Sequence, residues 1–142
     1  MKATELRIGN LVLSNGILLR VDTIEIDGCS GQLLNPKQEP NFNKGLEPIP
    51  LTEEWLVRFG FELSQSNKHI FSIDASIKEF TVLKYKNLSD ILPEYKHLNH
   101  IDFVISFPTY YDDVNFYGFK YVNQIQNLYF ALTGEELILK NK

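Results

Sequence analysis

Hydrophobic and polar residues alternate over two segments near the start of the chain, residues 6–13 and 17–26. Both segments are rich in leucine, isoleucine and valine, which favour extended structure. Asn15 and Gly16 lie between them, and this pair favours a two-residue turn because both residues tolerate a positive φ. The pattern therefore predicts an N-terminal β-hairpin, followed by a short third strand near residues 32–34.

Similar patterns in the middle of the chain predict further strands. Alternating segments and runs of β-branched or aromatic residues cover 61–63, 68–73, 79–85 and 101–107, and we expect these strands to form an antiparallel sheet. A further strand is predicted over residues 116–119, after a loop. Residues 88–98 are compatible with a loop or an irregular helix, and residues 135–139 with a final strand or an extended tail.

Two segments show helical features. Thr52 is a typical N-cap residue and precedes two acidic residues, and Gly60 is typical of a helix C-terminus, so a short helix is predicted over residues 53–59. Over residues 120–132, apolar residues recur at the three- and four-residue spacing of one helical face. Gly134 is expected to end this second helix.

These elements predict an α+β fold with one or more antiparallel sheets. The N-terminal hairpin is expected to belong to a small SH3-like barrel unit, beside the short helix and the C-terminal helix. A chain of 142 residues is long enough for a single domain, within which residues 1–50 form a candidate β-rich subdomain. Residues 35–50 contain four of the six prolines and predict a long loop or flap.

Composition and charge narrow the classes of function. A hydrophobic fraction of 44% indicates a folded chain, and the net charge of −4 disfavours a nucleic-acid partner. Cys29 is the only cysteine, so no disulfide within the chain is expected. The N-terminus has no apolar signal-peptide segment, and no window is apolar enough to span a membrane. We therefore expect a cytoplasmic protein without a membrane partner.

Catalytic and metal-binding motifs are weak. The sequence contains no phosphate-binding glycine loop, no zinc-protease motif and no hydrolase elbow. His97 and His100 stand three residues apart, and Asp112 is next to Asp113, but both patterns are also ordinary in loops. Cys29 has no neighbouring base. The sequence therefore favours a protein that is not an enzyme and needs no metal or cofactor.

Two groups of residues are candidates for binding a partner or a ligand. Tyr110 and Tyr111 fall in a predicted loop over residues 109–115, where exposed tyrosines indicate an interaction surface. The candidates on the second helix are Asn123, Gln126 and Asn127, which share one face. Amides hydrogen-bond peptide groups or base edges, although these residues also fit the solvated face of the helix.

Three blocks carry a resemblance to a known family: Arg7 to Asn10, residues 48–61 and residues 121–137. They resemble a family of short uncharacterised proteins of Bacteroides-type gut bacteria and their phages. The resemblance implies a phage or mobile-element setting. It also implies a histidine in relatives where this chain has Asn123, so no histidine-dependent reaction is expected at that position.

We therefore expect a non-enzymatic accessory protein that binds a protein partner, for example one that counteracts a host defence. The alternative is a small-molecule or nucleotide-binding protein whose loop over residues 35–50 closes on the ligand. The sequence leaves open whether the chain forms a homo-oligomer through an edge strand.

Overall fold

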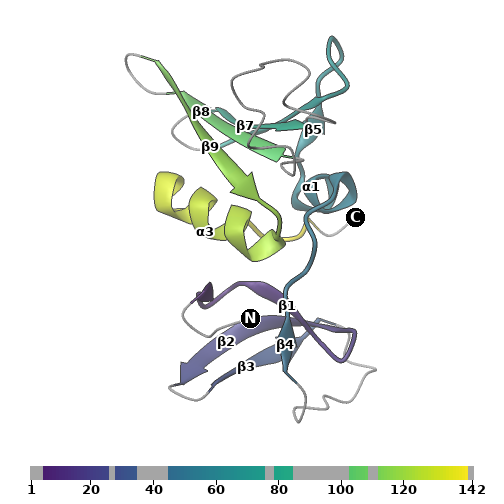
Figure 1. Cartoon of the computed structure of the whole chain (residues 1–142), viewed down its shortest axis with the longest axis vertical. Helices are drawn as coiled ribbons and strands as arrows, with labels where there is room; N and C mark the ends of the chain where they lie inside the picture. The colour runs from purple at the N-terminus through teal and green to yellow at the C-terminus, as the bar shows by residue number, and fades with distance from the viewer. Residues whose placement is uncertain are drawn as a thin grey trace. The chain divides into compact units, whose positions relative to one another are not determined.

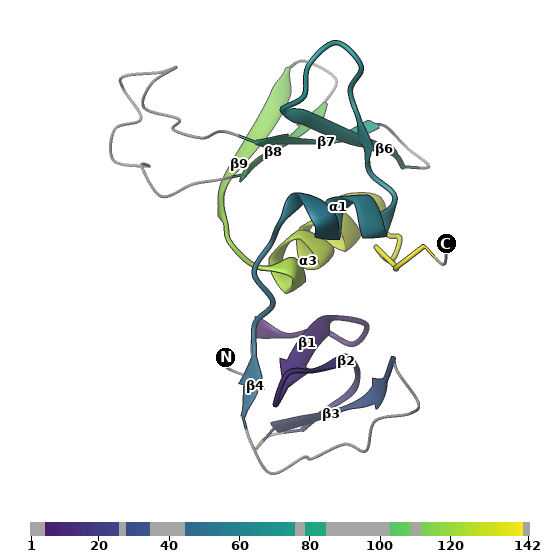
Figure 2. The same ribbon diagram turned by 90° about the vertical axis from the view of Figure 1, so that its right-hand side faces the viewer.

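The computed structural model describes residues 5–25, 28–34, 45–75, 79–84, 103–108 and 112–140. These residues form two antiparallel sheets and two helices, so the predicted α+β fold class is confirmed (Figures 1 and 2). The chain divides into two compact units. The first joins Met1–Pro50 with Tyr121–Leu128, and the second joins Leu51–Lys120 with Tyr129–Lys142. The first unit therefore contains the predicted subdomain 1–50 together with residues that the prediction did not include.

The first unit contains a four-stranded sheet with the order β3-β2-β1-β4. Its strands are β1 (Leu11–Ser14), β2 (Ile17–Glu25), β3 (Gly28–Leu33) and β4 (Leu46–Glu47). The predicted hairpin is present, because Asn15 and Gly16 have φ values of 52° and 76° between β1 and β2. Positive φ at both turn residues matches the right-handed twist of the two strands. The closure of this sheet into an SH3-like barrel stays a prediction.

Three predictions in this unit need correction. The third strand, predicted near residues 32–34, already begins at Gly28, because Gly28 pairs with Glu25 and Cys29 with Ile24. The first strand begins at Leu11 rather than at residue 6, because Gly9 has a φ of 93° and Asn10 N donates to Arg7 O at 3.0 Å, which turns the chain. Within the predicted loop over residues 35–50, Leu46 and Glu47 pair with β1 as strand β4. Residues 35–44 lie outside the described residues.

The core of the first unit is aliphatic. One cluster of buried residues consists of Leu6, Val12, Leu19 and Val21, with Ile17, Cys29, Leu33 and Leu46 packed against them. Helix α3 (Val122–Thr133) begins within this unit, where Val122 N donates to Ile49 O at 2.9 Å and Pro50 pairs with Tyr121 in an isolated bridge. This pairing keeps residue 121 extended, so the helix begins two residues after its predicted start.

The second unit contains a five-stranded sheet with the order β5-β6-β7-β8-β9. Its strands are β5 (Glu62–Leu63), β6 (Ile70–Asp74), β7 (Glu79–Lys84), β8 (Phe103–Pro108) and β9 (Asp113–Phe119). Strand β9 begins three residues before its predicted start, because Asp113 pairs with Pro108 and Val114 with Phe107. Residues 113–115 are thus strand rather than loop.

Aromatic rings fill the core of the second unit. Phe80 is fully buried and contacts the rings of Phe61, Phe107 and Tyr129 at centroid distances of 5.2–6.1 Å. The ring of Tyr129, from the last part of α3, meets that of Phe80 edge to face, an arrangement that the quadrupoles of the rings favour. This contact fixes the end of α3 on the sheet.

Helix α1 (Glu53–Phe59) has the predicted bounds. Gly60 ends it in the left-handed conformation, with a φ of 89°. The C-terminal tail contacts the last turn of this helix, since Lys140 N donates to Arg58 O at 2.9 Å. Residues 135–139 do not form a strand, which was one of their two predicted forms. Within the part of the chain that the structure describes, neither helix has the length and apolar character needed to cross a membrane.

Candidate functional site

The three amides nominated on the second helix lie in the first unit, against the segment that precedes β1. Asn123 and Asn127 both donate from Nδ2 to Glu5 O, at 3.2 and 3.3 Å. Both side chains therefore hold the main chain of the same residue. Asn123 is buried, and its Oδ1 makes no hydrogen bond to the described residues.

Gln126 holds two further main-chain groups. Its Oε1 accepts from Leu11 N at 2.9 Å, and its Nε2 donates to Gly9 O at 3.4 Å. The side chain is 1% exposed, so each bond replaces one that water would otherwise make. Gln126 thus satisfies a donor and an acceptor on either side of Asn10.

Asn10 is a fourth amide of this network, and the sequence analysis did not nominate it. The residue is fully buried; its Oδ1 accepts from Arg7 N and its Nδ2 donates to Asn127 Oδ1, both at 2.8 Å. The position of an asparagine directly after Gly9 was a usable signal, because asparagine side chains often bond the main chain of a turn.

These bonds fix the turn formed by Arg7, Ile8, Gly9 and Asn10, which we call the latched turn. Its main chain is also joined to β2, since Gly9 N donates to Val21 O at 2.7 Å and Val21 N donates to Asn10 O at 2.8 Å. Side-chain amides from α3 and main-chain groups of β2 therefore hold the turn from two sides.

Ile8 stands at the tip of the latched turn. Its side chain is 58% exposed, although its neighbours Leu6 and Asn10 are buried. The guanidinium of Arg7 donates from Nη1 to Ile8 O at 3.3 Å, which holds the carbonyl next to the exposed side chain. The arrangement presents one apolar side chain on a main chain that has little freedom to move.

The structure changes the interpretation of the nominated residues. The solvated-face alternative is wrong for Asn123 and Gln126, because both are buried against the N-terminal segment. Their assignment to a partner or ligand stays a prediction, and the geometry gives them a positioning role behind Ile8. Tyr110 and Tyr111 lie outside the described residues.

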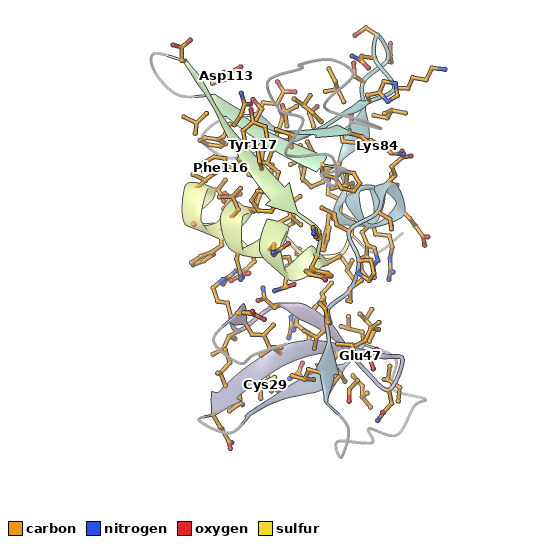
Figure 3. The ribbon with its side chains drawn as sticks, in the orientation of Figure 1. Cys29, Glu47, Lys84, Asp113, Phe116 and Tyr117 are labelled. Atoms are coloured by element: carbon orange, nitrogen blue, oxygen red, sulfur yellow. The ribbon has the colours of Figure 1, made fainter. Side chains whose placement is uncertain are left out.

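The described residues offer little chemistry for catalysis. Cys29 lies on β3 (Figure 3). Burial, with a smaller contribution from the charge of Asp22, raises the pKa of its thiol, which disfavours the nucleophilic thiolate. Asp112 and Asp113 are exposed at the start of β9, while His97 and His100 fall outside the described residues. No group of three or more potential metal ligands occurs in the described parts of the chain.

Tyr129 also has a shifted titration. Burial raises its pKa, and the charge of Glu135 and a 3.5 Å hydrogen bond from the Tyr129 hydroxyl to that carboxylate raise it further. Its ring packs on that of Phe80 in the core of the second unit, which gives Tyr129 a structural role.

Comparisons of the chain with models of protein families, with curated proteins and with solved structures find no match.

Proposed function

We propose that the chain is a non-enzymatic accessory protein that acts by binding a protein partner, and that Ile8 on the latched turn is the anchor of this contact. The observation that carries the proposal is an exposed isoleucine on a turn whose main chain is held by buried amides. Isoleucine exposed alone is ordinary on a protein surface. Its presentation on so constrained a turn is what favours recognition.

Preorganisation explains why such a turn suits binding. A flexible loop loses conformational entropy when a partner immobilises it, and this loss reduces the affinity. In the latched turn that entropy is lost on folding, because Gln126 and Asn10 already fix Gly9 and its neighbours. Burying an isoleucine side chain in a partner then contributes about 1.5–3 kcal/mol.

The proposed partner has an apolar pocket of the size of one branched aliphatic side chain. Arg7 is next to Ile8 and partly exposed, which favours carboxylate or carbonyl oxygens at the rim of that pocket. Anchor side chains of this kind supply most of the binding free energy in many protein interfaces, while the surrounding contacts mainly exclude water.

The biological setting in this proposal comes from the resemblance of three sequence blocks, one of which is the latched turn itself. We place the protein in the cytoplasm of a Bacteroides-type host, as a product of a phage or mobile element that counteracts a host defence. The alternative, a small-molecule or nucleotide-binding protein, depends on a loop of which residues 35–44 lie outside the described residues, and it stays a prediction.

The test compares two exposed isoleucines, one in each unit. Ile8→Glu changes the latched turn, and Ile138→Glu is the matched control because Ile138 is 64% exposed in the C-terminal tail. A photo-crosslinking amino acid is placed at position 8 or 138 in Bacteroides-type cells, and proteins joined to the chain are identified by mass spectrometry. The affinity of the purified partner for each variant is then measured by calorimetry.

We expect one protein to crosslink from position 8 and not from position 138. Ile8→Glu should weaken its binding by about 30-fold or more, which corresponds to about 2 kcal/mol, and Ile138→Glu should leave it unchanged. Equal binding by both variants, or no specific crosslink from position 8, would contradict the proposal. Circular dichroism of Ile8→Glu checks that the fold is retained.

A further inference from the structure

We infer that a second copy of the chain binds along the outer edge of β9, so that two β9 strands pair antiparallel about a two-fold axis. This inference goes beyond the proposed function, which concerns the latched turn of the first unit. It rests on three observations in the second unit: the place of β9 in the sheet, the side chains along the strand, and the charges at its two ends.

Strand β9 is the last strand of the five-stranded sheet and pairs with β8 on one side (Figure 1). Among the described strands, none pairs with its other side. An edge strand presents a row of main-chain donors and acceptors, which makes it a template for a further strand. From Asp113 to Phe116 the pairing with β8 is regular, and the irregularity comes after Phe116.

The side chains of β9 do little to discourage pairing. Proteins protect sheet edges with lysines, prolines, bulges or inward-pointing charges. Strand β9 carries one charged residue, Asp113, at its first position, and its irregularity lies after Phe116, outside the regular stretch from Asp113 to Phe116. Val114 is 43% exposed and Tyr117 is 37% exposed, although both lie within the strand. The edge is therefore apolar over most of its length.

The charges at the two ends of β9 favour pairing with a second copy of the chain, with the two strands antiparallel. Asp112 and Asp113 are exposed at the start of β9, and Lys120 is exposed directly after its end. Antiparallel pairing brings Lys120 of each copy to the acidic end of the other, so the favourable contact is made twice. Parallel pairing would place acid next to acid, which is unfavourable.

A two-fold axis at Asn115 gives a consistent register. It places Asp113 opposite Tyr117, Val114 opposite Phe116 and Asp112 opposite Gly118 of the second copy. Lys120 is then diagonal to Asp112, two positions along the strand, and no like charges oppose each other. Directly opposed residues in antiparallel strands have Cβ atoms about 4.5–5.5 Å apart, within reach of apolar contact. Five residues of each strand form a small interface, so we expect a weak dimer with a dissociation constant on the order of micromolar.

The dimer is tested by charge reversal and rescue in the full-length protein. Sedimentation velocity at increasing protein concentration measures the dissociation constant of the wild type, Lys120→Glu, and the triple variant Asp112→Lys, Asp113→Lys, Lys120→Glu. Lys120→Glu should weaken dimerisation at least about fivefold, because two like-charge contacts replace two favourable ones. The triple variant should restore it. Lys68→Glu, an exposed lysine before β6, makes the same charge change and should have no effect.

A covalent test checks the register. Asn115→Cys is combined with Cys29→Ser, and the protein is oxidised and analysed on non-reducing gels. A disulfide-linked dimer should form from Asn115→Cys and not from a cysteine at exposed Gln65 in the same background. A wild type that is monomeric at all concentrations, or a triple variant that dimerises no better than Lys120→Glu, would overturn the inference, as would binding of a different protein at this edge without self-association.

Discussion

Gln126 illustrates how one side chain determines local structure at the residue scale. Its amide bonds Leu11 N and Gly9 O in an environment without exposure to solvent. A buried main-chain group that loses its partner costs about 1–3 kcal/mol, more than the net gain from a typical hydrogen bond. The contribution of Gln126 to stability is therefore best measured by removing its polar atoms while keeping an apolar side chain of similar size.

Gln126→Leu should lower the free energy of unfolding by about 2–5 kcal/mol, since it leaves one donor and one acceptor without partners. Urea denaturation followed by fluorescence of Trp55 and by circular dichroism measures this change. Gln65→Leu is the control, because Gln65 is exposed, and surface changes of this kind stay within about 0.5 kcal/mol. Equal effects of the two changes would show that the latched turn does not depend on Gln126.

At the scale of single elements, the two helices end in different ways. Thr52 occupies the N-cap position of α1, as predicted, but its side chain makes no capping hydrogen bond. Thr133, at the end of α3, is buried; its Oγ1 donates to Tyr129 O at 2.7 Å and accepts from Glu135 N at 3.1 Å. The hydroxyl of Thr133 therefore joins the last turn of α3 to the tail, whereas the hydroxyl of Thr52 makes no such bond at its helix.

Because of this difference, we expect removal of the Thr133 hydroxyl to destabilise the protein more than removal of the Thr52 hydroxyl. Thr52→Ala should cost less than about 0.5 kcal/mol, although removal of a bonded N-cap typically costs about 1 kcal/mol. Thr133→Val keeps the shape of the side chain and should cost about 1–3 kcal/mol, because it leaves Glu135 N without the bond from Oγ1. Urea denaturation of both variants under the same conditions measures the two losses in the free energy of unfolding. A larger loss for Thr52→Ala than for Thr133→Val would show that the hydroxyl of Thr52 caps α1 in solution.

At the scale of the whole molecule, the first unit is assembled from two segments that lie far apart in the sequence. Residues 121–128 belong to it with Met1–Pro50, and they supply the amides that bond Glu5, Gly9 and Leu11. A fragment of 50 residues also buries little apolar surface on folding. The N-terminal segment by itself therefore lacks both the hydrogen-bond partners and part of the buried surface of this unit.

The fragment 1–50 should consequently show no cooperative thermal transition by circular dichroism. Joining residues 119–134 to its C-terminus through a glycine-serine linker should restore one, because the amides of α3 then bond the N-terminal segment again. In that fusion, Gln126→Leu should lower the midpoint temperature. A cooperative transition of the fragment alone would mean that the sheet of the first unit is stable without α3.

The sequence alone predicted the elements whose signals are local. The hairpin follows from Asn15 and Gly16, whose tolerance of positive φ is a property of the two residues, and α1 follows from its acidic first turn and Gly60. Most strands followed from alternation, which depends only on neighbouring positions. These features gave the α+β class, although the family resemblance and the protein-binding function stay predictions.

Tertiary structure decided the features that depend on residues far apart in the chain. In sequence, the helical face that carries Asn123 and Gln126 is compatible with exposure to solvent and with burial against another segment. Only the contact with residues 5–11 shows that this face is buried. The start of β1 depends on the turn that these amides stabilise, and the edge position of β9 depends on the order in which strands pair. Local propensity does not encode such choices, because they depend on tertiary partners; for the amides of α3 these partners lie more than a hundred residues away along the chain.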